Sequence, residues 1–175
     1  DDWGPSSSIR SMSPLGIGPV LKDRSAVNIG LVSCMSYLDD KGFGPSLVHR
    51  NGVTRARMFQ EITIAQQTDC SDDAALAAAL DQLEATLNSP LGNMKGDYCV
   101  GQYTLADCAW AGVCQVATNM GKGTAVSSRS AVNTWFAAVQ SHPSTSKEAI
   151  NPFSCLATKA DHDGNTMRDV RINTA

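Results

Sequence analysis

Residues 104–120 read TLADCAWAGVCQVATNM, and the architecture can be inferred outward from this stretch. Thr104 can cap the backbone amide three positions on, and Asp107 can reach back to the amide of Thr104, which predicts a reciprocal capping arrangement at a helix start. After Asp107 the stretch carries no charged side chain. We therefore expect a helix that is buried on all sides rather than an amphipathic one.

Helical patterns surround this stretch. Apolar residues at helical spacing predict helices over residues 27–40, 53–70, 71–87 and 130–141. Ser71-Asp72-Asp73 supplies an N-cap for the third of these helices, and a proline stops the last one. Residues 14–21 (PLGIGPVL) predict a bend that enters an edge strand, because proline cannot donate to a sheet. The fold class is therefore expected to be mainly α, with a small amount of sheet near the start.

The composition excludes several classes of protein. The 175 residues are 42% hydrophobic, which is typical of a globular chain and not of a disordered one. There are 14 basic and 17 acidic side chains, a formal net charge of −3, so the balance offers no basic stripe for nucleic acid. No window approaches the run of about 18 apolar residues that a transmembrane helix needs. We therefore expect neither a nucleic-acid partner nor a membrane span.

Patterns that could carry metal or catalytic chemistry are weak. The six cysteines lack a C-x-x-C spacing and the three histidines are far apart, so we expect no metal site and interpret most cysteines as small buried hydrophobic residues. Ser46 and His49 lack the nucleophile elbow of a hydrolase, and residues 161–165 (DHDGN) place glycine wrongly for a calcium loop. Arg55 and Arg57 could hold an anion, although a solvated helix face explains them more simply.

Several segments of this sequence, among them the start of the stretch quoted first, resemble the glutathione transferase superfamily, and its zeta (maleylacetoacetate isomerase-like) class most of all. Residues 98–108 (YCVGQYTLADC) are similar to the family's capping box and central buried helix, and residues 132–143 to the helix that follows. Residues 13–21 resemble the proline–glycine loop before the third strand of a thioredoxin-like domain, and residues 37–47 fall where that domain ends. The resemblance covers roughly residues 11–153 and implies a glutathione-transferase-like all-helical C-terminal domain preceded by a truncated thioredoxin-like α/β remnant.

The sequence departs from this family at its start and in the glutathione site. About ten residues precede the loop, whereas the family has a β-α-β unit of about 30 residues there, with its catalytic Ser, Tyr or Cys. We therefore expect the first half of the thioredoxin-like domain to be absent and predict no catalytic residue. Gly30 and Leu31 stand where the family holds the γ-glutamyl group of glutathione with polar side chains, and neither can bind it. Gly18 and Pro19 are the glutathione-binding positions that survive, through backbone groups only.

Two functions follow from the resemblance. The first is a non-catalytic glutathione-transferase-like protein, without a cofactor, that acts as a scaffold, an interaction module or a subunit of a larger assembly. A protein partner or a second copy would then cover the sheet edge and apolar helix face that the missing half-domain leaves exposed. The alternative is a glutathione-dependent, zeta-like transferase or isomerase whose N-terminal half is missing from this chain. A third hypothesis is a carrier that binds apolar ligands in the cleft beside the buried helix.

The expected organisation has five parts. A polar tail covers residues 1–12, the remnant of the thioredoxin-like domain residues 13–44, and a linker residues 45–52; the helical domain covers residues 53–153, and a second polar tail residues 154–175. The sequence does not name a compartment. We expect a soluble protein, intracellular or organellar, in which any targeting segment has been removed or never existed.

Overall fold

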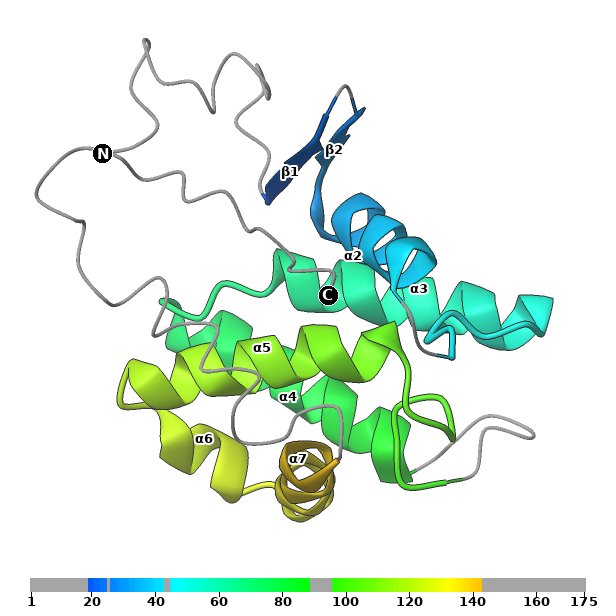
Figure 1. Cartoon of the computed structure of the whole chain (residues 1–175). Coiled ribbons are helices and arrows are strands. Elements are labelled where there is room, and N and C mark those ends of the chain that lie inside the picture. The colour runs from blue at the N-terminus through cyan, green and yellow to red at the C-terminus, as the bar shows by residue number, and fades with distance from the viewer. Residues whose placement is uncertain (1–18, 25, 43–44, 89–95, 143–175) are drawn as a thin grey trace, which may run out of the picture. The chain divides into compact units, whose positions relative to one another are not determined.

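The computed structural model describes residues 19–24, 26–42, 45–88 and 96–142 (Figure 1). The elements along the chain are β1 (Val20–Asp23), β2 (Ala26–Ile29), α2 (Leu31–Lys41), α3 (Gly52–Gln67), α4 (Asp73–Asn88), α5 (Leu105–Asn119), α6 (Gly123–Ser127) and α7 (Ser130–Ser141). Described residues up to position 139 belong to one compact unit, and residues 140–142 belong to a second. The described chain is thus mainly helical with one small antiparallel sheet, as the sequence predicted.

The two strands form a hairpin with two different faces. Lys22 lies opposite Val27 in the antiparallel register. Because alternate residues of a strand point to opposite faces, Val27 and Ile29 share one face and Asn28 lies on the other. Asn28 Oδ1 accepts a hydrogen bond from Ser33 Oγ of α2 at 3.4 Å, so α2 covers the Asn28 face. On the other face, Val27 and Ile29 keep 42% and 37% of their surface exposed.

The helix predicted over residues 27–40 is wrong at its start. Residues 27–29 belong to strand β2, and α2 begins at Leu31. Gly30 separates the two elements at a φ of 86°, a conformation that favours glycine, and its N–H donates to the carbonyl of Pro19 at 2.8 Å. Val27 and Ile29, which precede Gly30, are β-branched and suit a strand. Their spacing of two residues is that of a strand, whereas the spacing of four residues from Val27 to Leu31 is that of a helix, so the apolar pattern fits both structures.

Helix α5 lies at the centre of the core. It packs against α3 and α6, while α2 packs against α3 from the other side, so α3 lies between α2 and α5 (Figure 1). Trp110 of α5 is fully buried. The same core contains buried side chains from the other long helices, among them Met58, Ile62, Leu76, Leu80, Leu83, Val132, Trp135 and Val139. Trp110 and Trp135 thus belong to the core, and Phe136 packs against it while partly buried.

A buried carboxylate holds the start of α5. Thr104 and Asp107 form the capping box that the sequence predicted. Asp107 Oδ2 accepts hydrogen bonds from Thr104 N at 2.8 Å and Thr104 Oγ1 at 3.1 Å. Its other oxygen, Oδ1, accepts from Cys99 N at 2.9 Å and from Trp135 Nε1 at 2.9 Å. One fully buried side chain thus joins α5 to the loop before it and to α7.

A second buried carboxylate, Glu61 of α3, joins three helices. Arg57 Nη2 lies 2.8 Å from Glu61 Oε1, one helical turn away, and the Glu61 side chain is 0% exposed. Trp110 Nε1 of α5 donates to Glu61 Oε2 at 3.1 Å, and Thr86 Oγ1 of α4 donates to Oε1 at 3.4 Å. The interpretation of Arg57 as part of a solvated helix face is therefore wrong, and a role for it in binding an external anion stays a prediction. Its partner is a buried carboxylate of the same helix.

The connections after α3 and α5 differ in detail from the sequence prediction. Helix α3 ends at Gln67 rather than at residue 70, because Thr68 has an extended backbone conformation. Asp72 caps α4, accepting hydrogen bonds from the amides of Ala74 and Ala75 at 2.8 and 3.2 Å. The short helix α6 follows a turn at Gly121, and the sequence did not predict it. No helix in the described part of the chain is long and apolar enough to cross a bilayer.

Candidate functional site

An open cleft of about 660 Å³ lies along one face of α5. Its α5 wall consists of Cys108, Ala109, Gly112, Val113, Val116 and Met120. Leu31 and Met35 of α2 line it from another side, together with Ala65 near the end of α3 and residues 68–71 of the following loop. The prediction that α5 is buried on all sides is therefore wrong on this face, which the described helices leave uncovered. The volume is typical of sites for small molecules, which span about 300–1,000 Å³.

Gly112 widens the cleft from the middle of α5. A glycine in a helix interior costs about 0.5–1 kcal/mol relative to alanine. Packing does not require it, because a Cβ atom at Gly112 would have no neighbouring heavy atom within 4 Å. Gly112 was not among the predicted site residues, although an isolated glycine inside an apolar helix is a signal for a packing or functional role. Since close packing is excluded, the remaining consequence of the missing side chain is space in the cleft.

Asp69 supplies charge at the rim of the cleft. Among the described residues that line the cleft, it is the one whose side chain is formally charged at neutral pH. Asp69 Oδ1 accepts hydrogen bonds from Ser71 Oγ at 2.6 Å and from Ser71 N at 2.8 Å. These bonds, the hydroxyl first, lower the pKa of Asp69 below its ordinary value, and Lys122 adds to the effect. The rim therefore carries a carboxylate.

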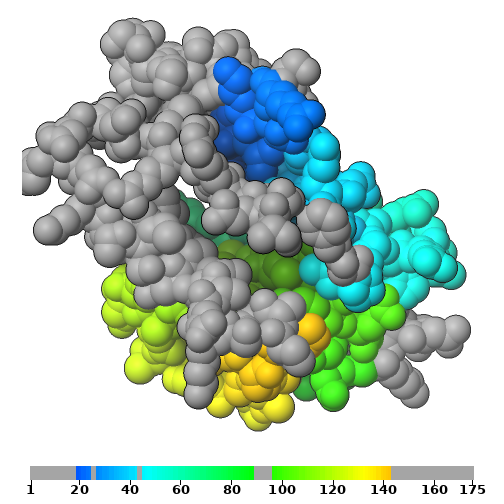
Figure 2. Space-filling model, in the orientation of Figure 1, coloured from blue at the N-terminus to red at the C-terminus, as the bar shows by residue number. Residues whose placement is uncertain are grey.

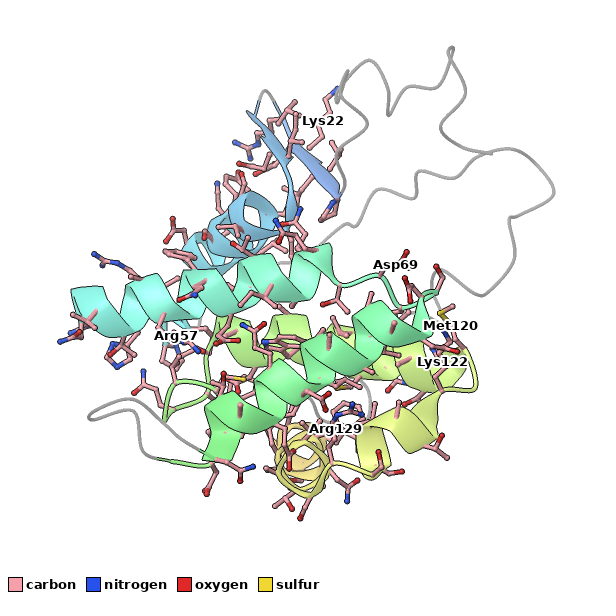
Figure 3. The ribbon with its side chains drawn as sticks, turned by 180° about the vertical axis from the view of Figure 1, so that it is seen from behind. Lys22, Arg57, Asp69, Met120, Lys122 and Arg129 are labelled. Carbon is pink, nitrogen blue, oxygen red and sulfur yellow. The ribbon has the colours of Figure 1, made fainter. Side chains whose placement is uncertain are left out.

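Lys122 holds the loop that carries Asp69. Its Nζ donates to the carbonyls of Cys70 and Ser71, both at 2.8 Å, and lies 2.6 Å from Asp73 Oδ1. Figure 3 shows Lys122 and Asp69 at the same end of helices α3 and α5. The three N–H donors of the ammonium group are thus matched by three acceptors of residues 70–73. Residues 69–73 contain three aspartates, so this single cation leaves the rim with an excess of negative charge.

Two half-buried thiols line the cleft. Cys70 Sγ lies 3.9 Å from the carbonyl oxygen of Val113, and Cys108 Sγ lies 3.4 Å from Tyr103 Oη. Burial raises the pKa of both thiols, so both stay neutral at neutral pH. The remaining described cysteines, which are free and buried as the sequence predicted for most of them, are Cys34, Cys99 and Cys114. Cys155 lies outside the described residues.

The positions assigned to glutathione are only partly described. Gly18 lies outside the described residues. The carbonyl of Pro19 accepts a hydrogen bond from Gly30 N at 2.8 Å and lies 3.5 Å from Cys34 Sγ. Gly30 offers no side chain, and Leu31 lines the apolar cleft. A role for Gly18 and Pro19 in binding glutathione stays a prediction.

Of the other candidate groups, the Ser46–His49 pair does not form a site. Ser46 Oγ donates to Asp39 Oδ2 at 2.6 Å, whereas His49 Nδ1 accepts from Asn51 N at 3.0 Å, so no nucleophile–base pair joins Ser46 and His49. The DHDGN segment at 161–165 lies outside the described residues. Among the residues that are described, no group of three His, Cys, Asp or Glu side chains could hold a metal ion.

Comparison with known proteins identifies the class of fold. No family model matches the sequence, and no curated protein is significantly similar to it. A holo structure of maleyl pyruvate isomerase, a bacterial zeta-class glutathione S-transferase, aligns with a TM-score of 0.61 and 18% identity over 81% of this chain and 80% of that one. Maleylacetoacetate isomerase from Methylobacterium extorquens AM1, with bound malonate and GSH, aligns with a TM-score of 0.63 and 17% identity over 81% of this chain and 79% of that one.

The chain therefore has a glutathione-transferase-like fold, with structural similarity to the zeta class, as the sequence motifs predicted. At this identity the similarity establishes the fold, and function has to be argued from the site. The absence of the first half of a thioredoxin-like domain and the proposed domain boundaries stay predictions. The described part of that region is the β1–β2 hairpin and α2.

Proposed function

We propose that this chain is a non-catalytic protein with a glutathione-transferase-like fold that acts through binding, as a scaffold, an interaction module or a subunit of a larger assembly. The observation that carries the proposal is the pair Gly30 and Leu31. Leu31 faces an apolar cleft with Met35, and Gly30 has no side chain to accept the ammonium group of a γ-glutamyl moiety. A polar ligand placed there would lose hydrogen bonds worth about 1–3 kcal/mol each. The alternative, a glutathione-dependent transferase or isomerase, needs a glutathione site that this pair disfavours.

Calorimetric titration of the full chain with glutathione tests the proposal. We expect no saturable heat at millimolar glutathione, because neither residue replaces the polar pair that the resemblance implies. An S-alkyl glutathione serves as a control ligand, since its apolar arm fits the cleft whether or not the peptide part is recognised. Saturable heat with glutathione itself would contradict the non-catalytic proposal and favour the glutathione-dependent enzyme.

The surface that supports an interaction role is the uncovered face of the hairpin. Val27 and Ile29 lie side by side on it, and each exposes more than a third of its surface. Figure 2 shows the hairpin and the start of α2 in blue on the surface of the molecule. Leu38 of α2 is also exposed, at 47%. Apolar residues exposed together on a strand face are typical of sites that another chain covers.

Sedimentation velocity tests self-association through this face. We expect the wild-type chain to associate at micromolar concentration, and the double variant Val27→Glu, Ile29→Thr to be monomeric. A carboxylate at position 27 lies opposite Lys22, and threonine keeps a β-branched side chain, so the hairpin stays folded. Val53→Glu is the matched control, because Val53 is 73% exposed at the start of α3, where an acidic residue suits the helix dipole. Equal association of all three proteins would contradict a role for the hairpin face.

A second function is favoured by the cleft beside α5. We propose that it binds an apolar small molecule, which makes the chain a ligand carrier. Its volume of about 660 Å³ and its largely apolar lining support this proposal, and Gly112 enlarges it at a cost to helix stability. Ligand binding and protein interaction use different surfaces, so the chain can perform both.

A further inference from the structure

We infer that the cleft selects apolar ligands that carry a positive charge, with the Asp69 carboxylate at the rim binding the cationic group. This inference rests on the ligand-carrier function proposed above and assigns the chemical class of its ligand. Three features of the cleft support it: neutral walls, one charged group at the rim, and a gap along α5.

The walls of the cleft are apolar and rich in sulfur. Four of its residues carry sulfur: Met35, Cys70, Cys108 and Met120. The two thiols are neutral, because burial raises their pKa. Methionine side chains are flexible and polarisable, and they adapt to apolar ligands of different shapes. These walls therefore bind hydrocarbon surface and contribute no charge.

The charge of the cleft comes from its rim. Asp69 is ionised, and its Oδ1 is held by the amide and hydroxyl of Ser71. Lys122 lowers the pKa of Asp69, but its ammonium group makes its short contacts with Asp73 and two carbonyl oxygens, so within the described part of the chain Lys122 is not paired directly with Asp69. An anionic ligand would meet the repulsion of this carboxylate, whereas a cationic one would form an ion pair at the edge of an apolar surface.

The two ends of the cleft are far enough apart for an elongated ligand. Asp69 and Met120 both line the cleft, and Figure 3 shows them at the same end of α3 and α5. Gly112 precedes Met120 by eight residues, which corresponds to about 12 Å along a helix. The geometry fits a molecule whose apolar chain lies along α5 toward Gly112 and whose charged group lies at the rim. A long-chain amine has this chemistry.

Displacement of the neutral apolar dye Nile red from the full chain tests the inference. Octylamine and octanoate are matched competitors, with equal chains and opposite charges at neutral pH. We expect octylamine to displace the dye at about a fivefold lower concentration, the ratio that an exposed ion pair supplies at most. The ratio should approach one in about 1 M salt, where the Debye length falls to about 3 Å.

Three variants test which residues bind the dye and which residue selects octylamine. Gly112→Leu places a side chain in the middle of the cleft and should weaken dye binding while leaving the protein at least as thermally stable, because leucine favours a helix more than glycine does. Asp69→Asn keeps an oxygen that can accept from Ser71 and should remove the preference for octylamine without weakening dye binding. Asp40→Asn is the matched control, since Asp40 is exposed on α2 and does not line the cleft. It removes the same charge and should leave the preference unchanged.

Each contrary outcome has a distinct meaning. If neither Nile red nor octylamine binds the wild-type chain, the ligand-carrier function fails and the inference fails with it. If the dye binds and Gly112→Leu binds it as tightly as the wild-type chain does, the ligand site lies elsewhere and the inference is overturned. If octylamine and octanoate compete equally, or if the preference survives Asp69→Asn, ligand binding stands and the assignment of a cationic ligand is overturned.

Discussion

Replacing Asp107 by alanine is expected to lower the free energy of unfolding by about 4 kcal/mol, roughly a thousandfold in the folding equilibrium. The substitution leaves three buried N–H donors without their acceptor: the amides of Cys99 and Thr104 and the indole of Trp135. Each unsatisfied buried donor costs about 1–3 kcal/mol. Relaxation of the loop before α5 offsets part of the summed cost of the three unsatisfied donors. A loss of this size is a large share of the 5–15 kcal/mol that stabilises a typical domain.

Urea denaturation followed by tryptophan fluorescence measures this effect. Asp97→Ala is the matched control, because Asp97 is exposed in the loop before α5 and should change stability by less than about 0.5 kcal/mol. Asp107→Asn should give an intermediate loss, since the amide keeps one oxygen acceptor but turns N–H groups toward remaining donors. If Asp107→Ala destabilised the chain no more than Asp97→Ala, the carboxylate would not hold α5 in place.

Replacing Arg57 by methionine is expected to cost about 3–5 kcal/mol, because it leaves the buried charge of Glu61 without its cation. The hydrogen bonds from Trp110 and Thr86 to Glu61 remain, but both donors are neutral. Methionine keeps much of the apolar stem of arginine, so lost packing contributes little to the effect.

Arg55→Met provides the comparison on the same helix. Arg55 is exposed, so the same substitution there should change the free energy of unfolding by less than about 0.5 kcal/mol. The double variant Arg57→Met, Glu61→Gln should regain most of the lost stability, because a neutral amide at position 61 needs no cation and its oxygen can still accept the hydrogen bond from Trp110. Equal effects of the two arginine substitutions in urea denaturation would show that the Glu61 ion pair does not stabilise the fold.

The sequence predicted helices well where the signal is local, that is, where it lies within a few residues. The bounds of α7 agree with the prediction over residues 130–141, and the capping box of Thr104 and Asp107 was read from its spacing of three. The prediction failed for Val27–Ile29, where apolar spacing fits a helix and a strand equally well. Pairing with β1 decides between them, and this pairing is not visible in the segment itself.

The candidate site was predicted less well than the fold. The hypothesis of an apolar-ligand cleft beside the buried helix named its position, but not Asp69 or Gly112. These residues come from a loop after α3 and from the middle of α5, and they meet at one cleft only because α3 packs against α5. A pattern within one helix cannot show which of its faces a neighbouring element leaves uncovered.

The sequence alone specifies the features that depend on neighbouring residues, and the tertiary structure decides those that depend on contacts between distant residues. Capping and helix periodicity are properties of short segments, so the sequence shows them directly, whereas the assignment of Gly30 and Leu31 to a glutathione-binding position is a prediction from the resemblance to glutathione transferases. Each buried carboxylate has a partner that is distant in the sequence. Trp135 is 28 residues from Asp107, and Trp110 is 49 residues from Glu61. Such contacts form when helices pack, because burial then requires each carboxylate to find donors on whichever helix lies beside it. The cleft has the same origin, since it is the space that the packed helices leave along α5.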